Sequence, residues 1–542
     1  MVTQIQPRLT LRRDLVARLG DRCRYDVIVV GGGATGLGVA LDAAVRGLRV
    51  VLVESHDFAK GTSSRSTKLV HGGVRYLAQG NIGLVREALH ERTLLLKNAP
   101  HLAQPLPFVM PTYKWWEAPF YGIGLKMYDA LAGSAGLGRT EFLSRNETLA
   151  QLPMAQPDAL KGGVKYWDGQ FNDARLALAL ARTAAAQGAL LANYCRVTSL
   201  SHDNGRVSGV VCEDQFTGQV FQLMGDCVIN ATGVWVDELR RQDSVADGDP
   251  GVPATQPMVA PSQGVHMVVD RTFLGGSSAL MVPKTADGRV LFAVPWLGKL
   301  ILGTTDTPRH DLPREPEAFA EEIDFILSES ARYLQRAPAR KDVKSIWVGL
   351  RPLVKPPDDE GDNTKSLSRE HTIVVSRSGM VTVTGGKWTT YRAMAEDVLS
   401  QCTRHQLIRP TTSGQTKNLG LVGADVGNFE LKALCEPEGM HSYGSEHAWV
   451  RELPGAGNWL CEGLSEAMVR FAARYEYAIT VEDVLARRSR LLFLDASLAS
   501  HMAAAVAGIL QAETGQDPEQ AEFMDLCEQY LLRDQEKIVG SK

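Results

Sequence analysis

The stretch YDVIVVGGGATGLGVALDAAVRGLRVVLVE, residues 25–54, decides the fold of this 542-residue chain. Its first six residues are mostly apolar and β-branched and lead into glycines, as in a buried parallel strand. Small and apolar residues from Ala34 to Arg46 follow helical spacing, and Gly47 suits the C-cap before a second apolar strand, Arg49 to Val53. The stretch therefore predicts a complete βαβ unit within an α/β protein.

Three glycines, Gly31, Gly33 and Gly36, form the pattern G-x-G-x-x-G between this strand and this helix. Such glycines let the backbone approach a pyrophosphate, whose charge is favoured at a helix N-terminus. Glu54 follows about twenty residues later, where a carboxylate accepts hydrogen bonds from ribose hydroxyls and disfavours the 2′-phosphate of NADP. A glycine-rich turn alone also occurs for packing reasons, but this context predicts a dinucleotide with a free ribose diol.

The composition excludes several classes of protein. Hydrophobic residues make up 44% and charged residues 22% of the chain, and the net charge is -4. These values are typical of a globular protein and give no basic surface for nucleic acid, so we expect no nucleic-acid binding. The eight cysteines have no metal-ligand spacing, so we expect buried free thiols and no metal site. No secretory leader is visible, and no window holds the ~18 apolar residues that cross a bilayer.

Residues 61–77, GTSSRSTKLVHGGVRYL, are rich in small hydroxyl residues and glycines. By composition alone this segment is an ordinary polar loop. Further blocks follow it in order along the chain: NATGVW, VPW with LGTTD, GLRPL, LSREHT, GGKWTTYR and TVEDVLARRSRLLFLDA. With these blocks, the chain from Tyr25 to Ala496 resembles the FAD-dependent sn-glycerol-3-phosphate dehydrogenases of the aerobic, quinone-linked bacterial type. They belong to a wider family that includes D-amino-acid and glycine oxidases.

The resemblance implies an α/β fold in three parts: an FAD-binding Rossmann-like domain, a substrate domain on an antiparallel sheet and a C-terminal helical domain. Short strand-like runs between Met258 and Val383, and helical periodicity after about Ser400, agree with this division. We expect an N-terminal extension at 1–23, the FAD-binding domain at 24–100, 165–240 and 375–400, the substrate domain at 101–164 and 241–374, and the helical domain at 401–542.

The resemblance also implies where FAD is held. In the family, the late turn that includes Lys387 brings donors to the flavin pyrimidine edge. Lys387 or the helix N-terminus beside it would stabilise the negative charge that develops on reduction. The alternative is a structural turn with a solvent-exposed lysine. The expected FAD contacts are Gly31, Gly33, Gly36, Glu54, Thr62, Ser63, Ser64, Thr67, Lys68, His71, Gly72, Gly233, Gly385, Gly386, Lys387 and Thr389.

Three arginines are candidate ligands for a phosphorylated substrate, because the guanidinium fork matches phosphate oxygens and stays charged. Arg351 and Arg369 are assigned to the phosphate, and Arg75 to the phosphate or the C2 oxygen, although a typical arginine forms a surface salt bridge. The neighbouring Tyr76 completes the expected substrate-binding set.

Oxidation of a secondary alcohol needs a base for the hydroxyl proton, and histidine suits that task near neutral pH. His71 lies in the flavin-side segment and His266 begins a strand-like run, and spacing does not choose between them. The expected catalytic set is therefore His71, His266, Arg75 and Lys387. Thr305 and Asp306 rank second, with Tyr76.

The run YKWWEAPFYGIGLKMY, residues 113–128, interleaves aromatic residues with Lys114 and Lys126. Such a pattern suits a membrane interface, and packing between domains is an equal alternative. We hypothesise that this segment docks a cytoplasmic enzyme on the inner membrane.

The leading expectation is oxidation of sn-glycerol 3-phosphate to dihydroxyacetone phosphate in glycerol catabolism, by a homodimer that passes electrons to ubiquinone or menaquinone. One alternative is an oxidase that uses oxygen and releases hydrogen peroxide. A second is a flavin-fold protein that has lost catalysis; the presence of Arg75, Arg351, Arg369 and Lys387 argues against it.

Overall fold

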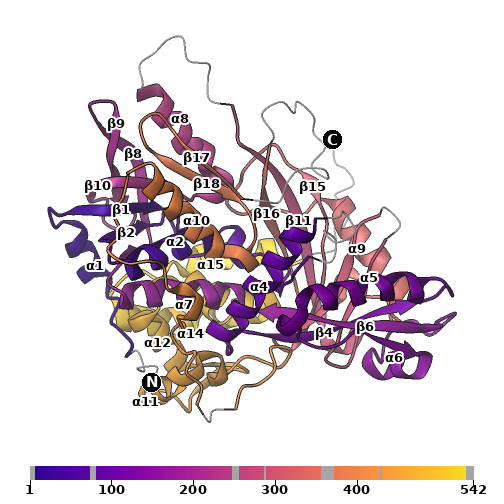
Figure 1. Cartoon of the computed structure of the whole chain (residues 1–542). Coiled ribbons are helices and arrows are strands. Elements are labelled where there is room, and N and C mark those ends of the chain that lie inside the picture. The colour runs from indigo at the N-terminus through magenta and orange to yellow at the C-terminus, as the bar shows by residue number, and fades with distance from the viewer. Residues whose placement is uncertain are drawn as a thin grey trace, which may run out of the picture.

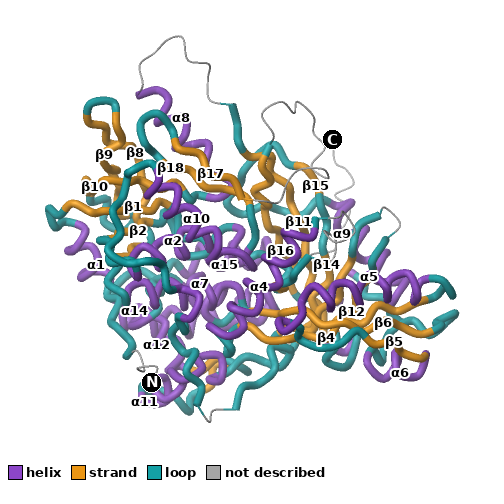
Figure 2. The backbone as a smooth tube through the Cα atoms, in the orientation of Figure 1, coloured by secondary structure: helices purple, strands orange, loops and turns teal. Residues whose placement is uncertain are grey.

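Two large sheets form the framework of the structure, the first on the left and the second on the right of Figure 1. The computed structural model describes residues 6–73, 81–246, 256–285, 288–355, 371–427 and 430–532. Helices cover the sheets, and the C-terminal helices lie below and behind the first sheet, as the tube in Figure 2 also shows.

The predicted βαβ unit is confirmed. It consists of β1 (Arg24–Val30), α2 (Ala34–Val45) and β2 (Val50–Val53), and the two strands pair in parallel with Val27 opposite Val50. Residues 27–30 of β1 and all of β2 are buried, which explains the continuous apolar sequence of these runs.

The first sheet runs in the order β17-β18-β10-β1-β2-β7, with the β8–β9 ribbon attached to β10. Its further strands are β7 (Leu190–Ala192), β8 (Cys195–Asp203), β9 (Arg206–Asp214), β10 (Val220–Asn230), β17 (His371–Val375) and β18 (Val381–Gly385). Helix α2 contacts both α7 (Asp173–Ala186) and α10 (Tyr391–Arg404). Because β1 pairs in parallel with β10, and β10 with β18, the carboxyl ends of these three strands lie side by side at one edge, where ligands of such sheets bind.

Strand β10 is long and continues through Gly225, because it pairs with β9 at one end and with β1 at the other. One strand prediction differs from the structure. The run 371–376 was expected in the substrate sheet, yet β17 pairs antiparallel with β18 at the edge of the first sheet. This difference arises from strand pairing, which a single segment does not encode.

The second sheet is mainly antiparallel, as predicted for the substrate domain. Its strands are β3 (Leu69–Val70), β4 (Ala103–Thr112), β5 (Glu141–Ser144), β6 (Gly162–Phe171), β11 (Val259–Asp270), β12 (Ala279–Val282), β13 (Leu291–Trp296), β14 (Lys299–Gly303), β15 (Thr307–Pro308) and β16 (Ser345–Val354). Helix α9 (Ala320–Tyr333) contacts β11 and β14, while α4 (Ile82–Asn98), α5 (Glu117–Ala132) and α6 (Arg145–Gln151) contact β4 or β6. The domain limits themselves stay a prediction. The expected limits put β3 and most of β6 in the FAD-binding domain, whereas both strands pair within this second sheet.

The C-terminal part is helical, as predicted. It contains α11 (His447–Glu452), α12 (Glu466–Tyr475), a π-helical turn (Asp483–Arg488), α13 (Leu491–Leu494), α14 (Ala496–Thr514) and α15 (Gln520–Tyr530), with a short hairpin of β19 (Trp459–Cys461) and β20 (Leu464–Ser465). Its apolar residues share one core with the second sheet, where Phe493 packs on Trp347. The helical domain is thus fused to the sheet rather than attached by a linker.

The remaining expectations concern the ends and the surface. The N-terminal extension contains α1 (Arg12–Leu19). Six cysteines are buried free thiols, as predicted, whereas Cys461 is half-buried and Cys23 is exposed. Across the described ranges, no helix combines the length and the apolar character that crossing a bilayer requires.

Candidate cofactor and substrate site

The glycine turn between β1 and α2 has the geometry that brings backbone close to a phosphate. Gly31 has φ 110°, and a Cβ there would lie 2.6 Å from the Ala231 carbonyl oxygen. A Cβ on Gly36 would lie 1.9 Å from the Gly31 oxygen, so the first turn of α2 packs directly on the glycine turn. Gly33 is the N-cap of α2. Close backbone packing therefore requires glycine at Gly31 and Gly36, and the contact of this turn with a pyrophosphate stays a prediction.

Glu54 lies beside this turn and its carboxylate is held in place. It accepts hydrogen bonds from the Gly32 N–H at 2.6 Å, the His56 N–H at 2.9 Å and the Ser55 hydroxyl at 3.0 Å. A carboxylate has about four acceptor positions, so capacity for a ribose hydroxyl remains. Burial lowers the pKa of His56, which favours a neutral imidazole next to the site.

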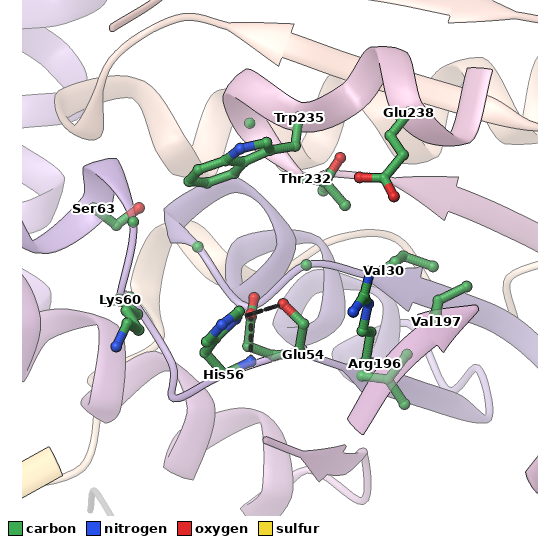
Figure 3. Close-up of a pocket in the computed structure, with 18 of the residues that line it drawn as sticks. Val30, Glu54, His56, Lys60, Ser63, Arg196, Val197, Thr232, Trp235 and Glu238 are labelled. Carbon is green, nitrogen blue, oxygen red and sulfur yellow. Dashed lines mark hydrogen bonds between the residues drawn. The ribbon is translucent and has the colours of Figure 1, made fainter. Parts of the chain in front are cut away.

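A pocket of about 1010 Å³, part of it open to solvent, surrounds these groups. Figure 3 shows Glu54 and His56 on one side of it and Trp235 and Glu238 on the other. It is lined by the glycine turn, by Thr62 and Ser63, by Gly233 and by Arg196 and Arg314. The glycine turn, the helix N-terminus and the held carboxylate are the groups that the ADP half of FAD requires, so the residues present fit this cofactor.

Several lining residues were not singled out from the sequence. The Arg314 guanidinium lies 3.9 Å from the ring centroid of Trp235, whose Nε1–H donates to the Leu312 carbonyl. The loop before α9 thus reaches from the second sheet to the mouth of the pocket. Trp235 belonged to the quoted block NATGVW, but Arg196, Glu238 and Arg314 carry no sequence signal because their segments are distant along the chain.

Only part of the segment 61–73 lines the pocket, although FAD contacts were expected along most of it. Thr62 and Ser63 line the pocket, and the Ser63 hydroxyl accepts from the Ala34 N–H at 2.9 Å, at the start of α2. Ser64 and Lys68 are buried and, within the described chain, are not among the residues that line this pocket. Gly72 packs tightly against side chains of α4 and α5, since a Cβ there would lie 2.4 Å from the Tyr128 hydroxyl.

The late turn contacts two of the other cofactor blocks, and its expected donors to the flavin stay a prediction. Gly385 and Gly386 have φ 80° and 76°, values that favour glycine, and the Thr384 hydroxyl donates to the Gly233 carbonyl. The Trp388 Nε1–H donates to the Ser63 carbonyl at 2.8 Å. Two further predicted contacts, Lys387 and Thr389, lie in this turn, half-buried and buried respectively.

His266 lies where the substrate sheet meets the flavin-side segment. On β11 it stands opposite Trp347 of β16, and the two rings stack with centroids 4.1 Å apart. Its Nε2 is 3.0 Å from the Thr67 hydroxyl. Burial, with Lys68 and Arg351 nearby, holds the pKa of His266 well below its usual value, so the imidazole is neutral near pH 7.

Arg351 lies near His266 on the adjoining strand. Its guanidinium donates to Asp306 Oδ1 at 3.1 Å, to Thr304 Oγ1 at 3.2 Å and to the Thr305 carbonyl at 2.9 Å. A Cβ on Gly264 would lie 2.3 Å from this guanidinium, so glycine makes room for it. The Thr305 hydroxyl instead donates to Glu322 in the buried interior, so only the Thr305 carbonyl contacts Arg351.

The other candidates are placed as follows. Asp306 forms an ion pair with Arg351, and its role in the site stays a prediction. His71 is half-buried just after β3. Arg75, Tyr76 and Arg369 lie outside the described residues, so their roles stay predictions.

A buried ion cluster next to His266 was missed by sequence reasoning. The Lys68 ammonium donates to Asp173 Oδ2 and the Ser64 carbonyl, and it faces the rings of Trp347 and Trp296. Burial lowers the pKa of Lys68 to about 7, while the adjacent cations hold the pKa of Asp173 below its ordinary value despite burial. Asp173 opens α7 and gave no signal, because an acidic residue in a first helical turn is commonplace.

Comparison with known proteins identifies the family. Residues 26–392 match the model of the FAD dependent oxidoreductase family, and residues 414–521 match the C-terminal domain of alpha-glycerophosphate oxidase. The mitochondrial glycerol-3-phosphate dehydrogenase of Bos taurus is 40% identical over 94% of this chain and 73% of that protein. That of Schizosaccharomyces pombe is 37% identical over 93% of this chain and 87% of that protein.

Solved structures agree. The glycerol-3-phosphate dehydrogenase from Bacillus halodurans complexed with FAD has a TM-score of 0.73 at 29% identity, over 96% of this chain and 97% of that chain. The L-alpha-glycerophosphate oxidase from Mycoplasma pneumoniae, with a TM-score of 0.56 and 17% identity over 72% of this chain and 97% of that chain, shares the fold. The glycine turn, the Glu54 pocket and these matches together show that the chain belongs to the family of FAD-dependent glycerol-3-phosphate dehydrogenases.

Proposed function

We propose that this enzyme oxidises sn-glycerol 3-phosphate to dihydroxyacetone phosphate in glycerol catabolism and that its electrons reach ubiquinone or menaquinone. The observation that supports the substrate most directly is the placement of Arg351 beside a neutral, buried His266. The guanidinium is a suitable ligand for the phosphate, and the imidazole is a suitable acceptor for a hydroxyl proton. FAD, when bound, supplies the acceptor for the hydride from C2.

The chain's own residues would act as follows. Thr67 fixes the ring of His266 through Nε2, and the buried Nδ1 has no hydrogen-bond partner among the described residues. We assign the proton of the substrate hydroxyl to the imidazole of His266. Asp306 and the Thr305 carbonyl orient the guanidinium of Arg351, which then meets the phosphate in a fixed direction. His71 remains the alternative base.

Anaerobic addition of glycerol 3-phosphate tests the reaction, because it should bleach the flavin absorbance in a single turnover. His266→Gln should slow bleaching by about 100-fold or more, the usual contribution of a general base. His71→Gln is the matched control, and a larger loss there than at His266 would transfer the role to His71. Flavin that does not bleach in the wild type would contradict the dehydrogenase itself and favour a protein without catalysis.

The acceptor is tested separately. Steady-state rates with a soluble quinone analogue should exceed those with oxygen. Rapid formation of hydrogen peroxide in air would favour the oxidase alternative and would contradict the quinone proposal. The curated relatives named above are mitochondrial, so the bacterial type is part of this proposal.

We also propose that the enzyme is cytoplasmic and lies peripherally on the inner-membrane surface through α5. Along this helix and just before it, large apolar side chains are exposed rather than packed between domains: Trp115 by 83%, Phe120 by 66% and Ile123 by 63%. Lys114 and Lys126 lie over the neighbouring rings of Trp116 and Phe142, so cations border the apolar surface. Helix α5 lies on the right of Figure 1, away from β1, α2 and β2 on the left. Aromatic residues bordered by lysine are typical of a helix at a lipid interface.

Vesicle sedimentation tests this surface. Trp115→Glu with Phe120→Glu should abolish binding to vesicles that contain anionic lipid, while Trp459→Glu, an equally large exposed side chain in the helical domain, should bind as the wild type does. Unchanged vesicle binding by the double variant would contradict the proposal. We also expect a homodimer. Light scattering of the same variants distinguishes a lipid-binding surface from a dimer contact: loss of the dimer with retained vesicle binding would identify α5 as a dimer contact.

A further inference from the structure

The loop that forms one wall of the flavin pocket, residues 55–68, is joined to the C-terminal helical domain by buried charges. This loop follows Glu54 directly and contains only one short 3-10 turn, Thr62–Ser64, of regular structure. A loop with so little structure of its own needs contacts from elsewhere to stay in one conformation. Three of those contacts, at Asp57, Lys60 and the Ser64 carbonyl, come from residues 480–490.

The first contact is made by Asp57, which is fully buried. Its carboxylate accepts from Arg487 Nε and from both terminal nitrogens of Arg488, one of them at 3.0 Å. Asn193 Nδ2 donates to the same carboxylate at 3.3 Å. Both arginines are 2% exposed, so solvent cannot replace the partners of any of these charges.

The second contact holds the middle of the loop. Lys60, which lines the flavin pocket, donates to both oxygens of Glu482 at 2.7 and 2.9 Å. Glu482 in turn accepts from Arg487, so the contacts at Asp57 and at Lys60 belong to one network.

The third contact is the Ser64 carbonyl. Arg490 Nη2 donates to it at 2.6 Å, and the same guanidinium lies 3.4 Å from Asp173. Lys68 donates to the same carbonyl from the other end of the turn. Ser63, immediately before, holds the first turn of α2 and accepts from Trp388, so this contact bears on the glycine turn and the late turn together.

The backbone of residues 480–490 is irregular in a way that serves these contacts. Asp483–Arg488 is π-helical, a rare form that recurs at functional sites, and it lets the adjacent Arg487 and Arg488 reach the same carboxylate. Arg490 has φ 59° and Lys68 has φ 65°, so both cations at the Ser64 carbonyl occupy the left-handed region. Such backbone strain persists only where surrounding contacts enforce it.

We propose that residues 480–490 are a clamp that positions the flavin-binding loop, so that the helical domain controls how tightly the enzyme retains FAD. Arg487, Arg488 and Arg490 are positioning residues in this scheme, since they act through Asp57 and Ser64. When the clamp is weakened the loop gains conformational freedom, and FAD binding must then restrict that freedom at the cost of affinity. The clamp concerns the FAD-binding loop alone and does not depend on the acceptor or the membrane surface.

Flavin affinity is the direct test. We expect Arg488→Met to raise the Kd for FAD by about 10-fold or more, within the usual range of coupling between sites, measured by fluorescence quenching on the apoprotein reconstituted with FAD. Arg474→Met is the matched control: it removes an arginine–carboxylate pair, with Glu513, in the same domain but away from the loop. A Kd for Arg488→Met within about twofold of the control, at equal circular dichroism, would overturn the clamp.

A second measurement keeps the proposal testable if Arg488→Met does not fold. Because coupling is reciprocal, FAD binding must stabilise the clamp in the wild-type enzyme. Hydrogen exchange of the peptide that covers residues 480–490 should slow when FAD is added to the apoprotein, whereas the peptide that covers α14 should change less. Equal exchange of the clamp peptide with and without FAD would refute the inference.

Discussion

Replacing Gly36 by alanine should remove FAD from an otherwise folded protein. A Cβ at this position would lie 1.9 Å from the Gly31 carbonyl oxygen, whereas an ordinary contact between carbon and oxygen is about 3.3 Å. The first turn of α2 and the glycine turn would therefore have to separate by more than about 1 Å, although alanine favours a helix by about 1 kcal/mol over glycine. The separation changes the position of the backbone N–H groups that meet the pyrophosphate.

Losing one hydrogen bond to a charged group costs about 1.5–3 kcal/mol, which corresponds to about 10- to 150-fold weaker FAD binding. The purified Gly36→Ala enzyme should therefore have a low ratio of flavin to protein absorbance, and titration with FAD should give the increased Kd. Gly508→Ala is the matched control, since it lies in helix α14 with no atom within 4 Å of the added Cβ. If Gly36→Ala retained FAD as Gly508→Ala does, the close backbone contact would not govern cofactor binding and the reasoning would be refuted.

Three further predictions concern catalysis and acid stability. Thr67→Val removes the hydrogen bond of about 1 kcal/mol that orients His266, so steady-state kinetics should show kcat lower by about 5-fold with KM little changed; an unchanged kcat would contradict that role. Arg351→Met should raise KM for glycerol 3-phosphate by about 10-fold or more, and a normal KM would place the phosphate elsewhere. Burial, with Arg175 and Arg182 nearby, lowers the pKa of His101 to about 3, so the unfolded chain binds a proton that the folded chain does not. Stability should therefore be lost as the pH falls below about 6.5, by about 3 kcal/mol at pH 4.5, and urea unfolding of His101→Gln should lack this loss. An identical pH dependence in His101→Gln would contradict the assignment.

Much of the fold could be predicted because its signals are local. The βαβ unit, the antiparallel character of the second sheet and the helical C-terminus each follow from periodicity, glycine position and strand length within one segment. Strand pairing could not be predicted in the same way. The edge position of β17 depends on β18, and the length of β10 depends on β9 and β1, so neither is encoded by the segment itself.

The candidate site residues also differ in whether a local sequence pattern indicates them. Gly31, Gly36 and Glu54 were found because turn geometry and a fixed spacing leave a pattern in the sequence. The pairing of Lys68 with Asp173 could not be predicted, because Asp173 opens α7 about a hundred residues later, and the role of Lys68 as a flavin contact stays a prediction.

The sequence by itself determined the dinucleotide fold and, through the order of its blocks, the family, because both depend on residues close together along the chain. Only the tertiary structure brought Thr67 to His266 and Asp57 to Arg488, pairs separated by 199 and 431 residues. Polar residues at such separations leave no periodicity, and each one alone has the appearance of an ordinary surface residue. They become a site and a clamp only when folding brings them together and excludes the water that would otherwise replace their partners.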